Sequence, residues 1–268
     1  MPPHAEYVEP FLGGGEVMRC KLPARENVGL DLDARVVGRA AELEARGEWR
    51  RLGLGDPGLM GGSYRFACGD AIAYLRGRRW QPTSLVYLDP PYLLETRRGH
   101  RRMYRHEFGA SGHRQLLEWA TGTEAVVLLS GYRSEMYDQA LSGWRVMEYW
   151  TMTRQGPERE SLWSNRPEPG ELHDYRFVGE GYRERERIRK LQGRWLARLR
   201  AMPRLEGLAL LAALRACGPE RISCPRSDDL GEFPPGVTDS ASVRGTGRGA
   251  RPGRRFLEGR ALQDRAQV

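Results

Sequence analysis

Short apolar runs that end at polar, glycine or proline residues recur along the chain and predict buried strands. Ser84–Leu88 is one such run, and Glu124–Ser130 is continuous enough to be typical of a parallel strand covered on both faces. Trp144–Met152 alternates less cleanly, which favours an antiparallel strand at a sheet edge. The pattern predicts an α/β fold built on a mostly parallel sheet.

Apolar residues at helical spacing lie between the predicted strands. His113–Thr121 places three of them on one side of a helix, and Ala34–Leu52 is also helix-like. A glycine-rich link, Gly53–Gly62, follows the second stretch. The alternation of strands and helices is that of a sheet flanked by helices.

Two more helices are predicted beyond the sheet, over Tyr182–Ala201 and Leu205–Ala216, with Pro203 between them. Arginines of the first helix would suit an accessory clamp on DNA phosphates. Alternatively, the helices form a packing hairpin whose Glu184 and Glu186 pair with basic residues three or four positions further on. We favour the packing interpretation.

Candidate chemistry lies where the predicted strands end. Asp89, Pro90, Pro91 and Tyr92 directly follow Ser84–Leu88, at the sheet edge where open α/β folds bind ligands. The prolines lack backbone donors, so their carbonyls and the Asp89 carboxylate form a cluster of acceptors beside an aromatic ring. Such a cluster suits a planar amine that donates hydrogen bonds while its nitrogen attacks.

A second cluster precedes it in the chain. A short strand from Glu6 leads into Gly13, Gly14 and Gly15, which permit positive φ and close approach of a ligand to the backbone. Asp31 ends the next predicted strand about 20 residues on, the usual spacing of an acid that binds ribose hydroxyls. Asp70 ends a third strand-like run. Three strand ends that carry glycines or an acid, followed by the DPPY sequence, form an ordered series that chance explains poorly.

With these segments, the chain resembles the Dam-like adenine-N6 DNA methyltransferases, which use S-adenosylmethionine. The resemblance is carried by YVEPFLGGG at Tyr7–Gly15, DLD at Asp31–Asp33, CGD at Cys68–Asp70 and YLDPPY at Tyr87–Tyr92. It covers most of residues 7–200, and further similarity lies in Glu95–Phe108, Val127–Tyr137, Ser161–Asn165 and Glu171–Phe177. It implies a Rossmann-like methyltransferase fold.

The resemblance also implies a role for each matching residue. Glu9, Phe11, Gly13 and Gly15 would line the S-adenosylmethionine pocket. Asp31 would hold the ribose hydroxyls, and Asp70 would accept from the adenine amine of the cofactor. Asp89 and the Pro90 carbonyl, with Pro91 beside them, would accept hydrogens from the target amine, and Tyr92 would stack on a flipped-out target base.

Two departures from the family pattern bear on activity. The chain starts at Met1, too late to include the N-terminal lysine- and glycine-containing segment that helps hold the methionine end of the cofactor. Either the true start lies upstream, or the protein binds the cofactor poorly. Between Asp31 and Asp70 it also lacks most of the usual target-recognition region. Sequence recognition is therefore relaxed, moved elsewhere or lost.

Charge agrees with a nucleic-acid partner. The net charge is +8 and the pI about 9.6, although an arginine bias this strong also fits a GC-rich coding sequence. Local clustering says more, because a basic loop directly follows the DPPY sequence. We predict that this loop holds phosphates of double-stranded DNA, the alternative being a solvated basic loop. The predicted DNA-binding residues are Arg97, Arg98, Arg101, Arg102, Tyr104 and Arg105.

We predict three parts: a methyltransferase domain over residues 1–180 with a short insert at 34–63, a helical extension over 181–223, and a disordered tail over 224–268 rich in Pro, Gly, Ser and Arg. No apolar run spans a membrane, and no signal peptide begins the chain. Four cysteines without metal-ligand spacing predict free thiols, no metal and a cytoplasmic location. His173 is predicted to be structural.

The predicted function is site-specific methylation of adenine N6 in DNA. The alternatives are a ribosomal-RNA base methyltransferase, since some of these also end a strand in DPPY, and a non-catalytic DNA-binding remnant. Cytosine-amine methylation is disfavoured, because those enzymes more often place serine at the position of Asp89. The recognition sequence, the oligomeric state and the biological role, whether restriction–modification, phage modification or regulation, stay open.

Overall fold

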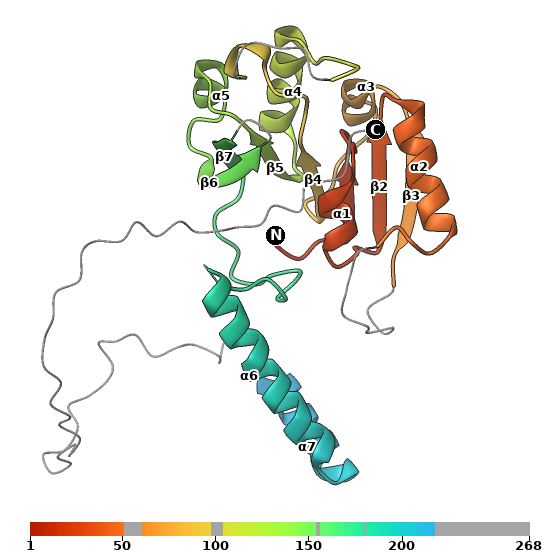
Figure 1. Cartoon of the computed structure of the whole chain (residues 1–268), viewed down its shortest axis with the longest axis vertical. Coiled ribbons are helices and arrows are strands. Elements are labelled where there is room, and N and C mark those ends of the chain that lie inside the picture. The colour runs from red at the N-terminus through yellow and green to blue at the C-terminus, as the bar shows by residue number, and fades with distance from the viewer. Residues whose placement is uncertain (51–60, 98–103, 154–155, 180, 218–268) are drawn as a thin grey trace, which may run out of the picture. The chain divides into compact units, whose positions relative to one another are not determined.

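The computed structural model describes residues 1–50, 61–97, 104–153, 156–179 and 181–217. Its centre is a seven-stranded sheet of order β3-β2-β1-β4-β5-β7-β6, with helices on both sides (Figure 1). The strands are β1 (Glu6–Glu9), β2 (Glu26–Asp31), β3 (Ser63–Cys68), β4 (Ser84–Leu88), β5 (Val126–Gly131), β6 (Arg145–Thr153) and β7 (Gly156–Ser164). The predicted Rossmann-like α/β fold, with a mostly parallel sheet flanked by helices, is confirmed.

The first five strands are parallel, whereas β7 pairs antiparallel with both β5 and β6. The prediction of an antiparallel edge strand over Trp144–Met152 is confirmed by β6. Its neighbour β7 was not predicted as a strand of its own. A proline near the start of β7 and glutamates at alternate positions give this segment a sequence more typical of a loop than of a strand.

Side chains of the central strands alternate between two core layers. Val8 and Val86 pack with α3, α4 and α5 on one face of the sheet. Tyr7 and Leu85 pack with α1 and α2 on the other. The helices are α1 (Glu16–Cys20), α2 (Ala34–Ala45), α3 (Ala71–Arg76), α4 (Ala110–Gly122) and α5 (Glu135–Ala140), with a 3₁₀ turn at Leu94–Thr96.

Helix α2 is shorter than predicted. The helix-like stretch extends to Leu52 in the sequence, but α2 ends at Ala45. Gly47 adopts φ 71°, a left-handed conformation that ends helices and that glycine takes without strain. Leu52 itself and most of the link Gly53–Gly62 lie outside the described residues.

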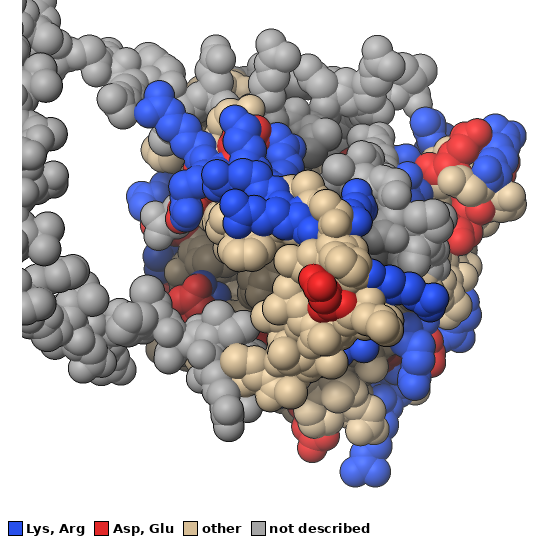
Figure 2. All heavy atoms as spheres, turned by 90° about the horizontal axis from the view of Figure 1, so that it is seen from below, with Lys and Arg blue, Asp and Glu red and all other residues tan. Residues whose placement is uncertain are grey.

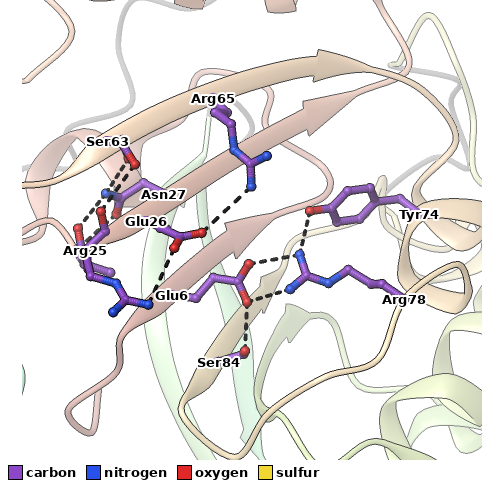
Figure 3. Close-up of polar contacts among 10 residues, drawn as sticks. Glu6, Arg25, Glu26, Asn27, Ser63, Arg65, Tyr74, Arg78 and Ser84 are labelled. Carbon is purple, nitrogen blue, oxygen red and sulfur yellow. Dashed lines mark hydrogen bonds and ion pairs between the residues drawn. The ribbon is translucent and has the colours of Figure 1, made fainter.

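Ion pairs tie the strands together at the amino ends of the parallel sheet (Figure 3). Glu6 of β1 bonds to Arg78 at 2.9 Å and accepts from the Ser84 hydroxyl of β4 at 2.8 Å. Glu26 of β2 lies 3.9 Å from Arg65 of β3. These contacts join strands that are distant in the sequence, so they support the parallel register.

The chain forms two compact units, Met1–Tyr175 and a second that begins at Arg176. The described part of the second unit is the helical pair α6 (Tyr182–Ala201) and α7 (Arg204–Cys217). Glu184 lies 3.6 Å from Arg187, and Glu186 lies 3.6 Å from Lys190, as predicted for a helix carrying such pairs. The predicted tail over 224–268 lies outside the described residues.

Basic side chains are more widespread than acidic ones on the face of the molecule that Figure 2 draws. None of the described helices is both long and apolar enough to cross a membrane. Within the described ranges, no cluster of His, Cys, Asp or Glu has a metal-binding arrangement. Cys20, Cys68 and Cys217 are free thiols.

His173 has a structural position, as predicted. Its Nε2 lies 3.1 Å from the Leu22 carbonyl oxygen, and its ring stacks on His4 with centroids 3.9 Å apart. It therefore joins the segment after β7 to the N-terminal residues.

Candidate active site

The carboxyl ends of β1, β2, β3 and β4 lie at one edge of the sheet because these strands are parallel. The chain runs from β1 outward to β2 and β3, then returns to β4 on the other side of β1. In open α/β sheets, ligands bind at such a reversal. Glu9 ends β1 and Asp89 follows β4, so the predicted cofactor and amine residues flank this switch point.

The glycine-rich turn is fixed by the acid that ends β2. The Gly13 N–H donates to Asp31 Oδ2 at 2.9 Å, and the Asp33 N–H donates to Oδ1 at 2.9 Å. Gly13 adopts φ +48°, and a Cβ placed there would meet no atom within 4 Å. The backbone of Gly13 is therefore exposed next to a carboxylate that still has acceptor capacity, an arrangement that suits a hydroxyl-bearing ligand.

Gly15 has a packing reason to be glycine. It adopts φ +61°, and a Cβ there would lie 2.5 Å from the Trp49 ring. Trp49 is buried beneath the turn. Gly15 thus sets the path of the backbone into α1, in addition to the cofactor role that the resemblance implies.

Asp70 and Phe11 occupy the rest of this half of the edge. The Asp70 carboxylate caps α3 by accepting from the Ala73 N–H at 2.7 Å, and the residue is exposed. Phe11 meets Phe108 edge-on, with ring centroids 5.2 Å apart. Phe11 therefore links the glycine-rich turn to the segment that follows DPPY.

Glu9 is a buried acid supported by a hydroxyl group. Its side chain accepts from the Tyr7 hydroxyl at 2.6 Å, and the residue is 3% exposed. Burial raises the pKa of Glu9 to about 8, the Tyr7 hydrogen bond opposes this, and the charge of Asp89 adds to it. Glu9 therefore holds a proton near neutral pH.

Asp89 is accessible to solvent but surrounded by protein on most sides. Burial in this recess raises the pKa of Asp89 to about 6, interaction with Tyr92 lowers it, and the charge of Glu160 raises it. Asp89 is consequently ionised at pH 7 yet close to its titration point. That is the state required of a carboxylate that accepts hydrogens from an amine.

A chain of hydroxyl groups connects DPPY to the antiparallel strands. The Ser130 Oγ of β5 lies 3.5 Å from the Tyr92 hydroxyl and 3.4 Å from the Tyr149 hydroxyl. Tyr149 of β6 and Thr151 donate to Glu160 of β7 at 3.3 and 3.1 Å. Glu160 is buried, and burial raises its pKa.

Sequence reasoning did not assign Ser130, Tyr149, Thr151 or Glu160 to the site. For the last three, the only signal is alternation: Tyr149 and Thr151 are two positions apart, as are Glu158 and Glu160, which places each pair on one face of a strand. Assigning them to the site required the pairing of Tyr149 with Glu160 across β6 and β7. That pairing is not encoded in local spacing.

Two further tyrosines lie close to the DPPY segment. Tyr132 meets Tyr92 edge-on, with centroids 4.7 Å apart, and its hydroxyl donates to Glu158. Tyr104 is 43% exposed and lies beneath the Arg97 guanidinium at 4.8 Å. These rings offer flat apolar surfaces and hydroxyl groups, which suit a planar heteroaromatic ligand.

Arg97 differs from its predicted role as a phosphate contact. Its guanidinium is buried, forms a two-point ion pair with Glu107 at 3.0 and 2.8 Å, and donates to the Tyr92 carbonyl. We therefore reassign Arg97 to support of the DPPY segment. Arg105 is exposed and lies 3.6 Å from Asp33. The other predicted phosphate contacts, Arg98, Arg101 and Arg102, lie outside the described residues.

No protein-family model matches the chain, and the search of curated proteins gave no match. Solved structures do match. Magnesium protoporphyrin IX methyltransferase from Synechocystis PCC 6803 with bound SAM matches with TM-score 0.38 and 16% identity, over 62% of this chain and 71% of that one. An rRNA methylase from Streptococcus thermophilus matches with TM-score 0.38 and 8% identity, over 63% of this chain and 91% of that one. TrmK from M. capricolum, in complex with S-adenosyl-homocysteine, matches with TM-score 0.37 and 8% identity, over 80% of this chain and 90% of that one.

Proposed function

We propose that this chain transfers a methyl group from S-adenosylmethionine to the exocyclic N6 amine of adenine in double-stranded DNA, at specific sites. The observation that carries the proposal is the placement of Asp89 and Tyr92 directly across the β1–β4 switch point from Glu9 and the glycine-rich turn. A methyl donor and a planar amine held at one crevice need this arrangement.

The residues of the β1–β2 side fit the cofactor. Asp31 offers acceptor oxygens for two ribose hydroxyls beside the open backbone of Gly13. Asp70, at the neighbouring strand end, offers a carboxylate oxygen for an adenine amine. When bound, S-adenosylmethionine supplies an electrophilic methyl group on a sulfonium. The resemblance to Dam-like methyltransferases extends the role to Glu9 and Phe11.

The residues of the β4 side fit an amine nucleophile. An aromatic amine is a weak nucleophile because its lone pair is delocalised into the ring. Asp89 and the Pro90 carbonyl would accept its two hydrogens and draw the lone pair out of conjugation, which is catalysis by positioning and electrostatics. As the nitrogen–carbon bond forms, the methyl–sulfur bond would break with its electron pair left on sulfur, and the amine would lose one proton, for which the Asp89 carboxylate is the proposed acceptor.

The base would stack on the tyrosines around DPPY. Removing a base from a duplex costs a few kcal/mol of stacking and pairing, which contact with Tyr92 partly offsets. Burial raises the pKa of Tyr92 well above its usual value, so its hydroxyl remains a donor. Arg105 remains the described candidate from the basic loop for a contact to phosphate.

Tritium transfer from S-adenosylmethionine to unmethylated duplex DNA, followed by nucleoside analysis, tests the proposal. We expect labelled N6-methyladenine. Label recovered only from ribosomal RNA would replace the DNA substrate with RNA, and labelled N4-methylcytosine would replace the base. Binding of DNA without binding of the cofactor, measured by calorimetry, would favour the non-catalytic remnant.

A further inference from the structure

Helix α6 carries a row of cations along one side. At 100° per residue, five basic side chains fall within a sector of about 80°. All five are exposed. We call this row the basic stripe, and its members are Arg183, Arg187, Lys190, Arg194 and Arg198.

The apolar residues of α6 lie on a different side of the helix. Ile188, Leu191, Trp195 and Leu199 form a second row beside the stripe. Gly207 of α7 packs there, and a Cβ on it would lie 3.7 Å from the Leu199 carbonyl oxygen. The partner helix therefore covers part of the apolar row and leaves the basic stripe in solvent.

The contacts that the stripe makes within α6 are weak enough to be exchanged. Arg187 and Lys190 pair with glutamates at 3.6 Å, and both cations are more than half exposed. Exposed pairs of this kind contribute about 0–1 kcal/mol. Arg198 stacks on the Trp195 ring at 5.3 Å, which orients its guanidinium without neutralising it.

We infer that the basic stripe of α6 binds the phosphate backbone of duplex DNA, an inference that rests on the proposed function for its choice of polyanion. The stripe runs from Arg183 to Arg198, a rise of about 22 Å along the helix, which is about six nucleotides of one strand at 3.4 Å each. Guanidinium groups match phosphate oxygens in pairs. Contacts to phosphate alone fix position on the duplex without reading its sequence.

Two triple variants of the full chain separate position from net charge. R183Q/R194Q/R198Q removes three charges from the stripe, and R185Q/R189Q/R200Q removes three exposed charges from the remainder of the helix. Glutamine is a good helix former, so circular dichroism should show unchanged helicity in both variants. Binding of fluorescent duplex DNA is measured by anisotropy over a salt series.

We expect the stripe variant to lose about 2.7 units of the slope of log K against log salt, or about 0.9 per phosphate contact. Its affinity at 0.15 M salt should fall at least roughly tenfold. The control variant should retain nearly the slope and affinity of the parent. Equal losses in both variants would reduce the effect to net charge and overturn the inference, as would a parent that does not bind DNA.

Vesicles containing phosphatidylserine provide the competing polyanion. Stripe-dependent binding to vesicles in preference to DNA would assign α6 to a membrane surface instead. The methylation assay keeps the inference separate from the proposed function. If the parent methylates DNA and the stripe variant binds DNA normally, only the inference fails. If the parent methylates no DNA but the stripe variant loses DNA binding, only the proposed function fails.

Discussion

The two edges of the parallel sheet hold acids on the same strand in opposite ways. Glu6, at the amino end of β1, is bound by the Arg78 guanidinium and the Ser84 hydroxyl. Glu9, three residues on, is bound by the Tyr7 hydroxyl, and its pKa is raised to about 8. An acid held by a cation supports the fold, whereas an acid held by hydroxyl groups in a buried place keeps its proton available for chemistry.

Asp89 and Glu160 follow the pattern of Glu9. Glu160 accepts hydrogen bonds from the hydroxyl groups of Tyr149 and Thr151, and Tyr92 interacts with both Glu160 and Asp89. Burial raises the pKa of both acids. Glu9, Asp89 and Glu160 are therefore acids whose pKa is raised by burial, and perturbed acids of this kind concentrate at functional sites.

The sharpest test of this contrast is Asp89→Ala. We expect methyl transfer to fall roughly 100- to 1,000-fold, because the variant removes one acceptor from the reacting amine. The fold should persist, since Asp89 is accessible to solvent. Single-turnover tritium transfer measures the effect, and Glu6→Gln serves as the matched control at the other edge. Turnover equal to that of the parent would eliminate the proposed mechanism.

Glu9→Gln tests the buried acid through stability. The folded-state pKa of about 8 exceeds the ordinary value of 4.5, so the folded protein binds the proton more tightly and loses stability as pH rises from about 4.5 through 8. Glutamine does not ionise, so the variant should lack this loss, which we expect to be roughly 3 kcal/mol.

Urea unfolding at pH 5 and pH 8 measures that difference. Lys21, whose pKa burial lowers to about 7, gains its charge as pH falls and is present in both proteins. Because the charge of Glu9 raises the Lys21 pKa, the comparison is repeated with Lys21→Met in both proteins. Parallel loss of stability in parent and variant would show that Glu9 does not carry the effect.

Glu160→Gln tests the link between DPPY and β7. Transfer requires ionised Asp89, so the rate of the parent should decline as pH falls through about 6. Because the charge of Glu160 raises the pKa of Asp89, the variant should shift this decline to lower pH. We expect kcat to fall about tenfold, or about 1.4 kcal/mol, since Tyr149 loses a charged acceptor.

A pH–rate profile with Glu148→Gln as control completes that test. Glu148 lies on β6 and pairs with Arg133 at 3.6 Å, as a surface acid of the same hairpin. Its variant should leave the profile unchanged, and Glu160→Asp should restore part of the shift. An unmoved acidic limb in Glu160→Gln would detach Glu160 from Asp89.

The smallest effect should come from Glu6→Gln. Breaking the pair with Arg78 removes one partly buried charge partner, and we expect a loss of about 1 kcal/mol in unfolding free energy. Methyl transfer at saturating substrate should stay at the level of the parent. A drop in kcat without loss of stability would contradict the assignment of Glu6 to the stability of the fold rather than to methyl transfer.

Strand ends were easier to predict than long-range neighbours. DPPY and Asp31 are marked locally, because a short apolar run stops at an acid or a proline. No local pattern indicates Glu160 as a site residue, because its position at the site depends on the antiparallel pairing of β7 with β5 and β6. The prediction of Arg97 as a phosphate contact was wrong for the same reason. Its basic neighbours indicate a surface loop, whereas Arg97 is buried in an ion pair with Glu107, ten residues away.

The contact between Gly15 and Trp49 has a consequence for recognising relatives of this chain. A Cβ at position 15 would lie 2.5 and 2.8 Å from two atoms of the Trp49 ring. Any lineage that replaces the glycine must also shrink the residue 34 positions later, so the two sites should covary. A search keyed to the glycine-rich turn would gain discrimination by demanding a large aromatic at that downstream position.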